Sequence, residues 1–115
     1  MAWDPKAARK VLDSSPLTSF VDERDKLSSF RLPSGRELAL VEENDKKVSV
    51  YLFPAPHNLP NAVLEKHYPP SASNSGRHSN LQLITSTLGF SSDACRVHVK
   101  DQEALEALLH WYQHA

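Results

Sequence analysis

The clearest structural signal in the chain lies in residues 94–112, which read ACRVHVKDQEALEALLHWY. The first six residues alternate between apolar and polar side chains, a pattern typical of a strand with one buried face. Asp101 then supplies an N-cap, and the apolar positions after it recur at intervals of three and four. These positions are Leu105, Leu108, Leu109 and Tyr112. The stretch predicts a strand followed by a helix over 101–110 that packs one apolar stripe against a sheet.

The first half of the chain adds a helix and three strands. Asp4 and Pro5 form a helix start, because an N-cap precedes proline at the first helical position, and good helix formers continue to residue 12. Strands are predicted at residues 30–32, 37–42 and 47–53, with turns at residues 33–35 and 44–45. Residues 17–29 are too mixed to assign.

A further strand is predicted at residues 81–87, and Gly89 marks a turn after it. The order of strands and flanking helices favours an α+β fold, a small antiparallel sheet packed against helices with one long functional loop. A chain of 115 residues is expected to form one domain, residues 1–115.

Composition and charge limit the partners. Hydrophobic residues make up 40% of the chain and charged residues 23%, as in an ordinary globular protein, and the formal net charge is -1 with histidine neutral. A charge this close to zero gives no general attraction to nucleic acid. DNA would have to be bound by a local basic patch.

Cys95 is the only cysteine, which excludes an intrachain disulfide and a thiolate metal cluster. It lies in the alternating run at residues 94–99, where a buried small apolar side chain is expected. The chain also shows no signal-peptide core and no apolar run long enough for a bilayer. We therefore expect a cytoplasmic protein with no membrane partner.

Residues 54–80 differ in character from the rest of the chain. They hold five of the eight prolines, Pro54, Pro56, Pro60, Pro69 and Pro70. Proline lacks a backbone donor, so the segment is excluded from a central strand. It predicts a long, partly rigid loop interrupted by a short helix at residues 60–67. Long ordered loops carry function more often than they merely connect.

Two short clusters in this loop carry its chemistry. Residues 66–72 (KHYPPSA) place a tyrosine ring, two pyrrolidine rings and a methyl group beside a lysine and a histidine. Residues 76–81 (GRHSNL) offer the donor fork of Arg77, which suits guanine or phosphate. Each cluster has a structural alternative. Tyr68 would be buried at the edge of the core, and Ser79 and Asn80 would cap neighbouring backbone groups.

The two clusters, in this order and spacing, resemble the DNA sulfur-binding domains of phosphorothioate-dependent restriction endonucleases, proteins of bacterial restriction-modification and defence. In that family a shallow apolar cavity holds the backbone sulfur. The resemblance implies that Tyr68, Pro69 and Ala72 form this cavity. It also implies a basic polar loop that contacts bases and phosphates. The implied DNA contacts are Lys66, His67, Ser71, Arg77, His78, Ser79 and Asn80.

Sulfur in place of a phosphate oxygen is larger, more polarizable and more weakly hydrated. A pocket without donors penalises oxygen, which loses water contacts without replacement, whereas sulfur gains dispersion contacts. One such atom supplies about 1–3 kcal/mol of discrimination. Specificity must therefore also use base and phosphate contacts. Arg31 and Arg36, beside the first turn, fit a solvated hairpin better than a DNA contact.

Two other functions remain open on the sequence. A reader of methylated-base DNA would need Tyr68 or Trp3 as a stacking ring, and a protein-interaction module would use the proline-rich loop. Catalysis, a cofactor and a metal site are not expected, since His110 and His114 lack a third ligand and no nucleophile motif is present. Cutting is assigned to a separate nuclease domain or effector, and the expected partner is phosphorothioate-modified duplex DNA.

Overall fold

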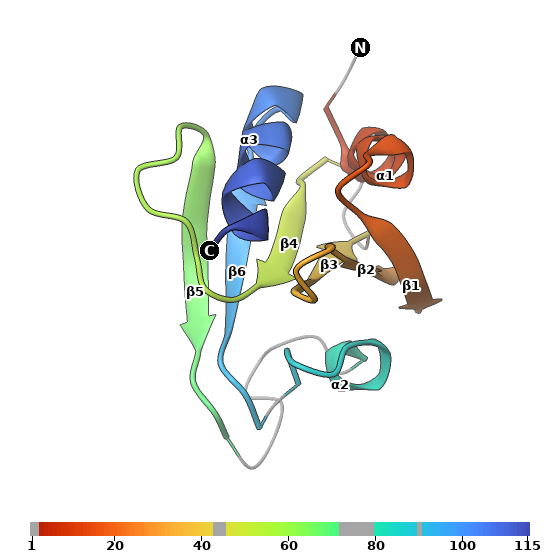
Figure 1. Cartoon of the computed structure of the whole chain (residues 1–115), viewed down its shortest axis with the longest axis vertical. Helices are drawn as coiled ribbons and strands as arrows, with labels where there is room; N and C mark the ends of the chain where they lie inside the picture. Colours follow the sequence, from red (N-terminus) through yellow and green to blue (C-terminus); the bar gives the residue numbers. More distant parts are fainter. Residues whose placement is uncertain (1–2, 43–45, 72–79, 90) are drawn as a thin grey trace.

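Within residues 3–42, 46–71, 80–89 and 91–115, which the computed structural model describes, the chain forms a six-stranded antiparallel sheet with three helices (Figure 1). The predicted α+β class is confirmed. The helices are α1 (Pro5–Ser14), α2 (Leu81–Ile84) and α3 (Gln102–Gln113). The strands are β1 (Ser19–Arg24), β2 (Leu27–Arg31), β3 (Glu37–Val41), β4 (Ser49–Leu52), β5 (Ala62–Tyr68) and β6 (Ala94–Val99).

The strands lie in the order β1-β2-β3-β4-β6-β5, so β1 and β5 are the edges of the sheet. The first four strands follow one another as neighbours, whereas β6 inserts between β4 and β5. Cross-strand pairing therefore brings together residues far apart in the sequence. Arg96 of β6 pairs with Tyr51 of β4 on one side and with Lys66 of β5 on the other.

Two tight turns connect the first three strands. In the β1–β2 turn, Asp25 and Lys26 both adopt positive φ angles, 44° and 65°. Such angles match the right-handed twist of a two-residue hairpin. Neither residue is glycine, so the turn left no clear sequence signal. The predicted β2–β3 hairpin is confirmed, with Gly35 at φ 91° and the Leu32 N–H donating to the Arg36 carbonyl at 2.9 Å.

Helices α1 and α3 cover one face of the sheet and form the larger core (Figure 1). Both start as predicted, since the Asp4 carboxylate accepts from the Ala7 N–H at 2.9 Å and the Asp101 carboxylate from the Ala104 N–H at 2.8 Å. The predicted apolar stripe of α3 is buried in this core. Its members are Leu105, Leu108, Leu109 and Tyr112.

Helix α2 covers the opposite face and closes a second, smaller core (Figure 1). This second core consists of Leu27, Ala39, Val41, Tyr51, Tyr68, Leu81, Ile84, Leu88 and Ala94. Cys95 of β6 is buried as predicted. Because strand β3 is buried at every position, the middle of the sheet is covered on both faces.

The prediction of a helix at residues 60–67 is wrong. Residues Ala62–Tyr68 form the edge strand β5, which pairs along its length with β6. Alanine, leucine, glutamate and lysine favour a helix locally, but pairing with β6 overrides that preference. The strand also lacked an alternating pattern, since five consecutive residues after Ala62 are exposed. The expected 27-residue loop is accordingly interrupted by a strand.

The strand predicted at residues 81–87 is also wrong, because Leu81–Ile84 is the helical turn α2. Leu81 and Ile84, three residues apart on this turn, enter the second core, as does Leu88 beyond the helix. That spacing is the helical signal, which the β-branched residues around it obscured. The turn predicted at residues 44–45 lies outside the described residues. Among the helices that the structure describes, none has the length and apolar character needed to span a bilayer.

Candidate nucleic-acid interface

Tyr68, predicted to wall an open cavity, is buried. Only 4% of its surface is exposed, and its ring lies in the second core with its centroid 6.0 Å from that of Tyr51. The structural alternative is therefore correct for Tyr68, and the prediction of an exposed Tyr68 surface is wrong. The cause is the segment around α2, which folds over this face of the sheet. Pro69 is exposed next to it, and Ala72 lies outside the described residues.

Lys66 and His67 do not face the same side of the sheet, because successive strand residues point to opposite faces. The Lys66 ammonium lies over the Tyr68 ring, 5.1 Å from its centroid. The His67 ring stacks on Phe53, and its Nε2 lies 2.9 Å from a carboxylate oxygen of Asp93. The two predicted contacts are thus separated, and only Lys66 shares a face with Tyr68.

The remaining predicted contacts extend across the sheet. The Asn80 amide donates to the Asp25 carboxylate at 3.2 Å, at the turn between β1 and β2. This turn belongs to the edge opposite β5, on the order of 20 Å away at ordinary strand spacing. Ser71 follows β5 and is partly buried. Arg77, His78 and Ser79 lie outside the described residues.

Arg96 is a candidate contact that the sequence reasoning missed. It pairs directly across from Lys66, and its guanidinium lies over the Tyr51 ring, 5.8 Å from the centroid. Its Nε is buried and has no hydrogen-bond acceptor among the described residues, with the nearest Glu65 oxygen 3.6 Å away. The alternation of β6 carried the signal, since Arg96 and His98 fall on one face and the buried Val97 on the other.

Glu65 and Lys47 complete this face of the sheet. The Glu65 carboxylate accepts from the Lys47 ammonium and, at 2.8 Å, from the Ser49 hydroxyl. Partial burial raises the pKa of Glu65. The hydrogen bonds and the charges of Lys47 and Arg96 lower that pKa by more than burial raises it, so it lies below the ordinary value. The carboxylate is therefore charged at neutral pH.

His98, on the same face, has a lowered pKa. Burial is the largest cause, and the positive charges of Lys47 and Lys100 add to it against the opposing effect of Glu65. The imidazole is accordingly neutral at pH 7. In the described residues, the face formed by β4, β6 and β5 thus presents the cations Lys47, Lys66 and Arg96 against the single carboxylate of Glu65. We call this set the basic face.

Two other arginines have structural contacts. The Arg31 guanidinium lies 3.9 Å from the Glu37 carboxylate. Arg36 lies over the Tyr112 ring, 5.7 Å from the centroid, and its guanidinium donates to the Ala115 carbonyl. Arg31 ends β2 and Arg36 directly precedes β3, so both lie at the β2–β3 hairpin and not on the basic face.

The histidines and the cysteine of the described residues do not form a metal or nucleophile site. The described residues contain no group of three or more histidine, cysteine, aspartate or glutamate side chains that could hold a metal ion. His110 lies in α3 and His114 at its C-cap. The Cys95 thiol is buried, and this burial together with the charge of Asp93 raises its pKa.

Comparisons with models of known protein families, with curated proteins and with solved structures found no match to this chain. The resemblance of its two short clusters to sulfur-binding domains stays a prediction.

Proposed function

We propose that the chain binds duplex DNA, with the basic face contacting backbone phosphates and with a preference for a phosphorothioate backbone. The observation that carries the proposal is the Lys66–Arg96 pair, two cations directly opposite each other on neighbouring strands. Like charges in this position destabilise a sheet. An anion placed between them removes the repulsion, and a nucleic acid backbone supplies such anions at regular spacing.

The two cations are also held in position before any ligand arrives. Each lies over a tyrosine ring, Arg96 over Tyr51 and Lys66 over Tyr68, and the two rings are neighbours in the second core. Cation–π contacts fix the direction of a long side chain at a modest gain in energy. A fixed guanidinium loses little entropy when it binds a phosphate bidentately. This arrangement supports phosphate binding more than a solvated pair of cations would.

The preference for sulfur rests on the prolines that follow β5. Pro69 and Pro70 are exposed directly after Tyr68, and neither pyrrolidine ring offers a hydrogen-bond donor. A backbone atom that contacts them loses water without gaining a donor, which costs oxygen more than sulfur. Tyr68 then acts as a buried support for Lys66 and Pro69 and makes no contact of its own with the sulfur.

Fluorescence anisotropy with two duplexes that differ in a single backbone sulfur tests the proposal. We expect the sulfur-containing duplex to bind tighter by about one decade, the equivalent of about 1.4 kcal/mol. We expect Lys66→Gln and Arg96→Gln each to weaken both duplexes and to reduce the salt slope by about one. Lys10→Gln, an exposed lysine of α1 on the other face, is the matched control.

The two halves of the proposal can fail separately. Equal affinity for the two duplexes removes the sulfur preference and leaves general DNA binding. If Lys66→Gln and Arg96→Gln bind both duplexes as well as Lys10→Gln does, the basic face is not the interface.

Of the two alternatives, the methylated-base reader lacks a stacking ring at the expected positions. Tyr68 is buried, and the Trp3 indole N–H donates to the Val99 carbonyl at 2.9 Å while its ring packs on the larger core. A protein-interaction module is the second candidate, favoured by the edge strand β5. Its Val63 and Leu64 are 45% and 50% exposed. If no duplex binds at low salt, this candidate takes precedence.

A further inference from the structure

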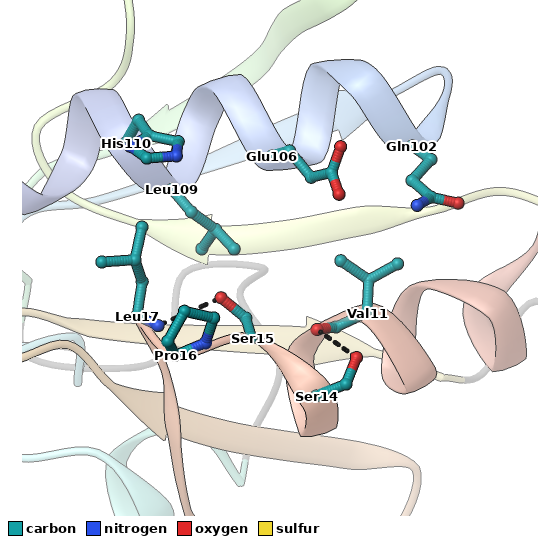
Figure 2. A pocket seen from close by; sticks show the side chains of 9 residues that line it. All are labelled: Val11, Ser14, Ser15, Pro16, Leu17, Gln102, Glu106, Leu109 and His110. Carbon is teal, nitrogen blue, oxygen red and sulfur yellow. Dashed lines mark hydrogen bonds between the residues drawn. The ribbon is translucent and has the colours of Figure 1, made fainter.

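A cleft of about 530 Å³ lies between the end of α1 and the length of α3. It is on the face of the sheet that these helices cover, opposite the basic face. Figure 2 shows Val11, Leu17 and Leu109 pointing into the gap between the two helices, with Glu106 on the α3 side. The volume falls in the range of sites for small ligands or single side chains.

The electrostatics of this cleft are negative. Glu106 is the only carboxylate among the lining residues, which also include His110, and it has no ion-pair partner among the described residues. Helix α1 ends at the cleft, where Ser14 and Ser15 line the opposite wall. Its last turn contains no basic residue, and its free carbonyls accept hydrogen bonds from the hydroxyls of Ser14 and Thr18. The carboxylate of Glu106 is therefore the feature of the cleft that favours a cation.

We propose that the cleft binds an alkylguanidinium or alkylammonium group, with the cationic head at Glu106 and the aliphatic stem against Val11, Leu17 and Leu109. A carboxylate accepts the two parallel N–H donors of a guanidinium in a bidentate contact. The apolar side chains remove the methylene groups of the stem from water. The site is independent of the proposed DNA binding, because the two lie on opposite faces of the sheet.

An NMR titration of the ¹⁵N-labelled full chain with butylguanidinium tests the site. We expect saturable shifts at the amides of Val11, Ser15, Leu17 and Leu109, and none there with butyrate, which has the same stem and the opposite charge. Glu106→Gln should weaken butylguanidinium binding by up to about fivefold, the effect of one exposed ion pair. Glu103→Gln, an exposed carboxylate of α3 that does not line the cleft, should leave the affinity unchanged.

A second titration with a blocked arginine tripeptide distinguishes the two sources of the cation. Tighter binding of the tripeptide than of butylguanidinium assigns the site to a basic side chain of a partner protein. Binding of butylguanidinium alone assigns it to a small-molecule cation. Equal shifts with butyrate and butylguanidinium, or the absence of saturable shifts at the cleft with both cations, would overturn the proposal.

Discussion

The carboxylate of Glu37 accepts hydrogen bonds from both the backbone N–H and the hydroxyl of Thr87, at 2.9 and 2.8 Å. Ser86 donates to it with the same two groups. The carboxylate is almost fully buried, so these donors replace the water that it loses on folding. They also tie the segment after α2 to the central strand β3. The cover over the second core, and over Tyr68, depends on this attachment.

Replacing this carboxylate should therefore lower the stability of the whole fold. We expect Glu37→Gln to lower the free energy of unfolding by about 2 kcal/mol at neutral pH, because an amide oxygen accepts these hydrogen bonds less strongly and its NH₂ group faces donors. Urea unfolding of the two proteins measures the difference. Glu103→Gln, an exposed change in α3, should leave the free energy of unfolding within about 0.5 kcal/mol of the native value.

The difference should also depend on pH. Burial raises the pKa of Glu37, but the hydrogen bonds from Ser86 and Thr87 together lower it by more than that. The pKa of Glu37 in the folded protein therefore lies below the ordinary 4.5. Stabilisation by such a group is full above the unfolded pKa and is lost as the pH falls through the folded pKa. The difference in the free energy of unfolding between the native protein and Glu37→Gln should therefore narrow as the pH falls below 4.5. A gap that stays constant over this range would contradict a charged Glu37.

Substitutions at Tyr68 and Pro69 should distinguish a structural role from a ligand-binding role. Because its ring packs against Tyr51 in the second core, we expect Tyr68→Ala to lower the free energy of unfolding by about 3–5 kcal/mol. The exposed Pro69→Ala should change it by less than about 1 kcal/mol and should still reduce the preference for sulfur. Thermal unfolding of both variants checks the first effect and anisotropy the second. A Tyr68→Ala protein with native stability would contradict the burial of the ring.

The sequence predicted those helices, turns and strands that a pattern of neighbouring residues is enough to specify. The caps Asp4 and Asp101, the turn at Gly35 and the alternation of Ala94–Val99 were each sufficient for their own element. Strand β5 was missed because it has no buried face along most of its length, and its existence depends on pairing with a strand some thirty residues later. No local pattern encodes that pairing.

The candidate site was predicted only in part for the same reason. Lys66 was found from its neighbours in the sequence, but Arg96 joins it through the β5–β6 register. The burial of Tyr68 depends on α2, a helix that the sequence had indicated as a strand. The conspicuous residues of the sequence thus include one member of the proposed basic face, Lys66, and the direction of each side chain came from the topology.

The Lys66–Arg96 pair should cost the protein stability in the absence of DNA. A double-mutant cycle with Lys66→Gln and Arg96→Gln isolates this term from the cation–π contacts that each single change also removes. We expect an unfavourable coupling of about 0.5 kcal/mol at low ionic strength. It should shrink in 1 M salt, where the screening length is about 3 Å. A favourable or salt-independent coupling would show that the two side chains do not repel each other.

Tyr112 gives a test at high pH. Its hydroxyl donates to the Glu37 carbonyl at 2.5 Å, and burial is the largest of the causes that raise its pKa to about 12. We expect Tyr112→Phe to lower the free energy of unfolding by about 1.5 kcal/mol at pH 7, since the carbonyl loses its donor. A group whose pKa is raised on folding stabilises fully below its unfolded pKa of 10.0 and loses that contribution as the pH rises toward 12. The gap between the two proteins in urea unfolding should therefore narrow between pH 10.0 and about 12. A constant gap over that interval would mean that the phenol ionises as readily in the folded chain as in the unfolded one.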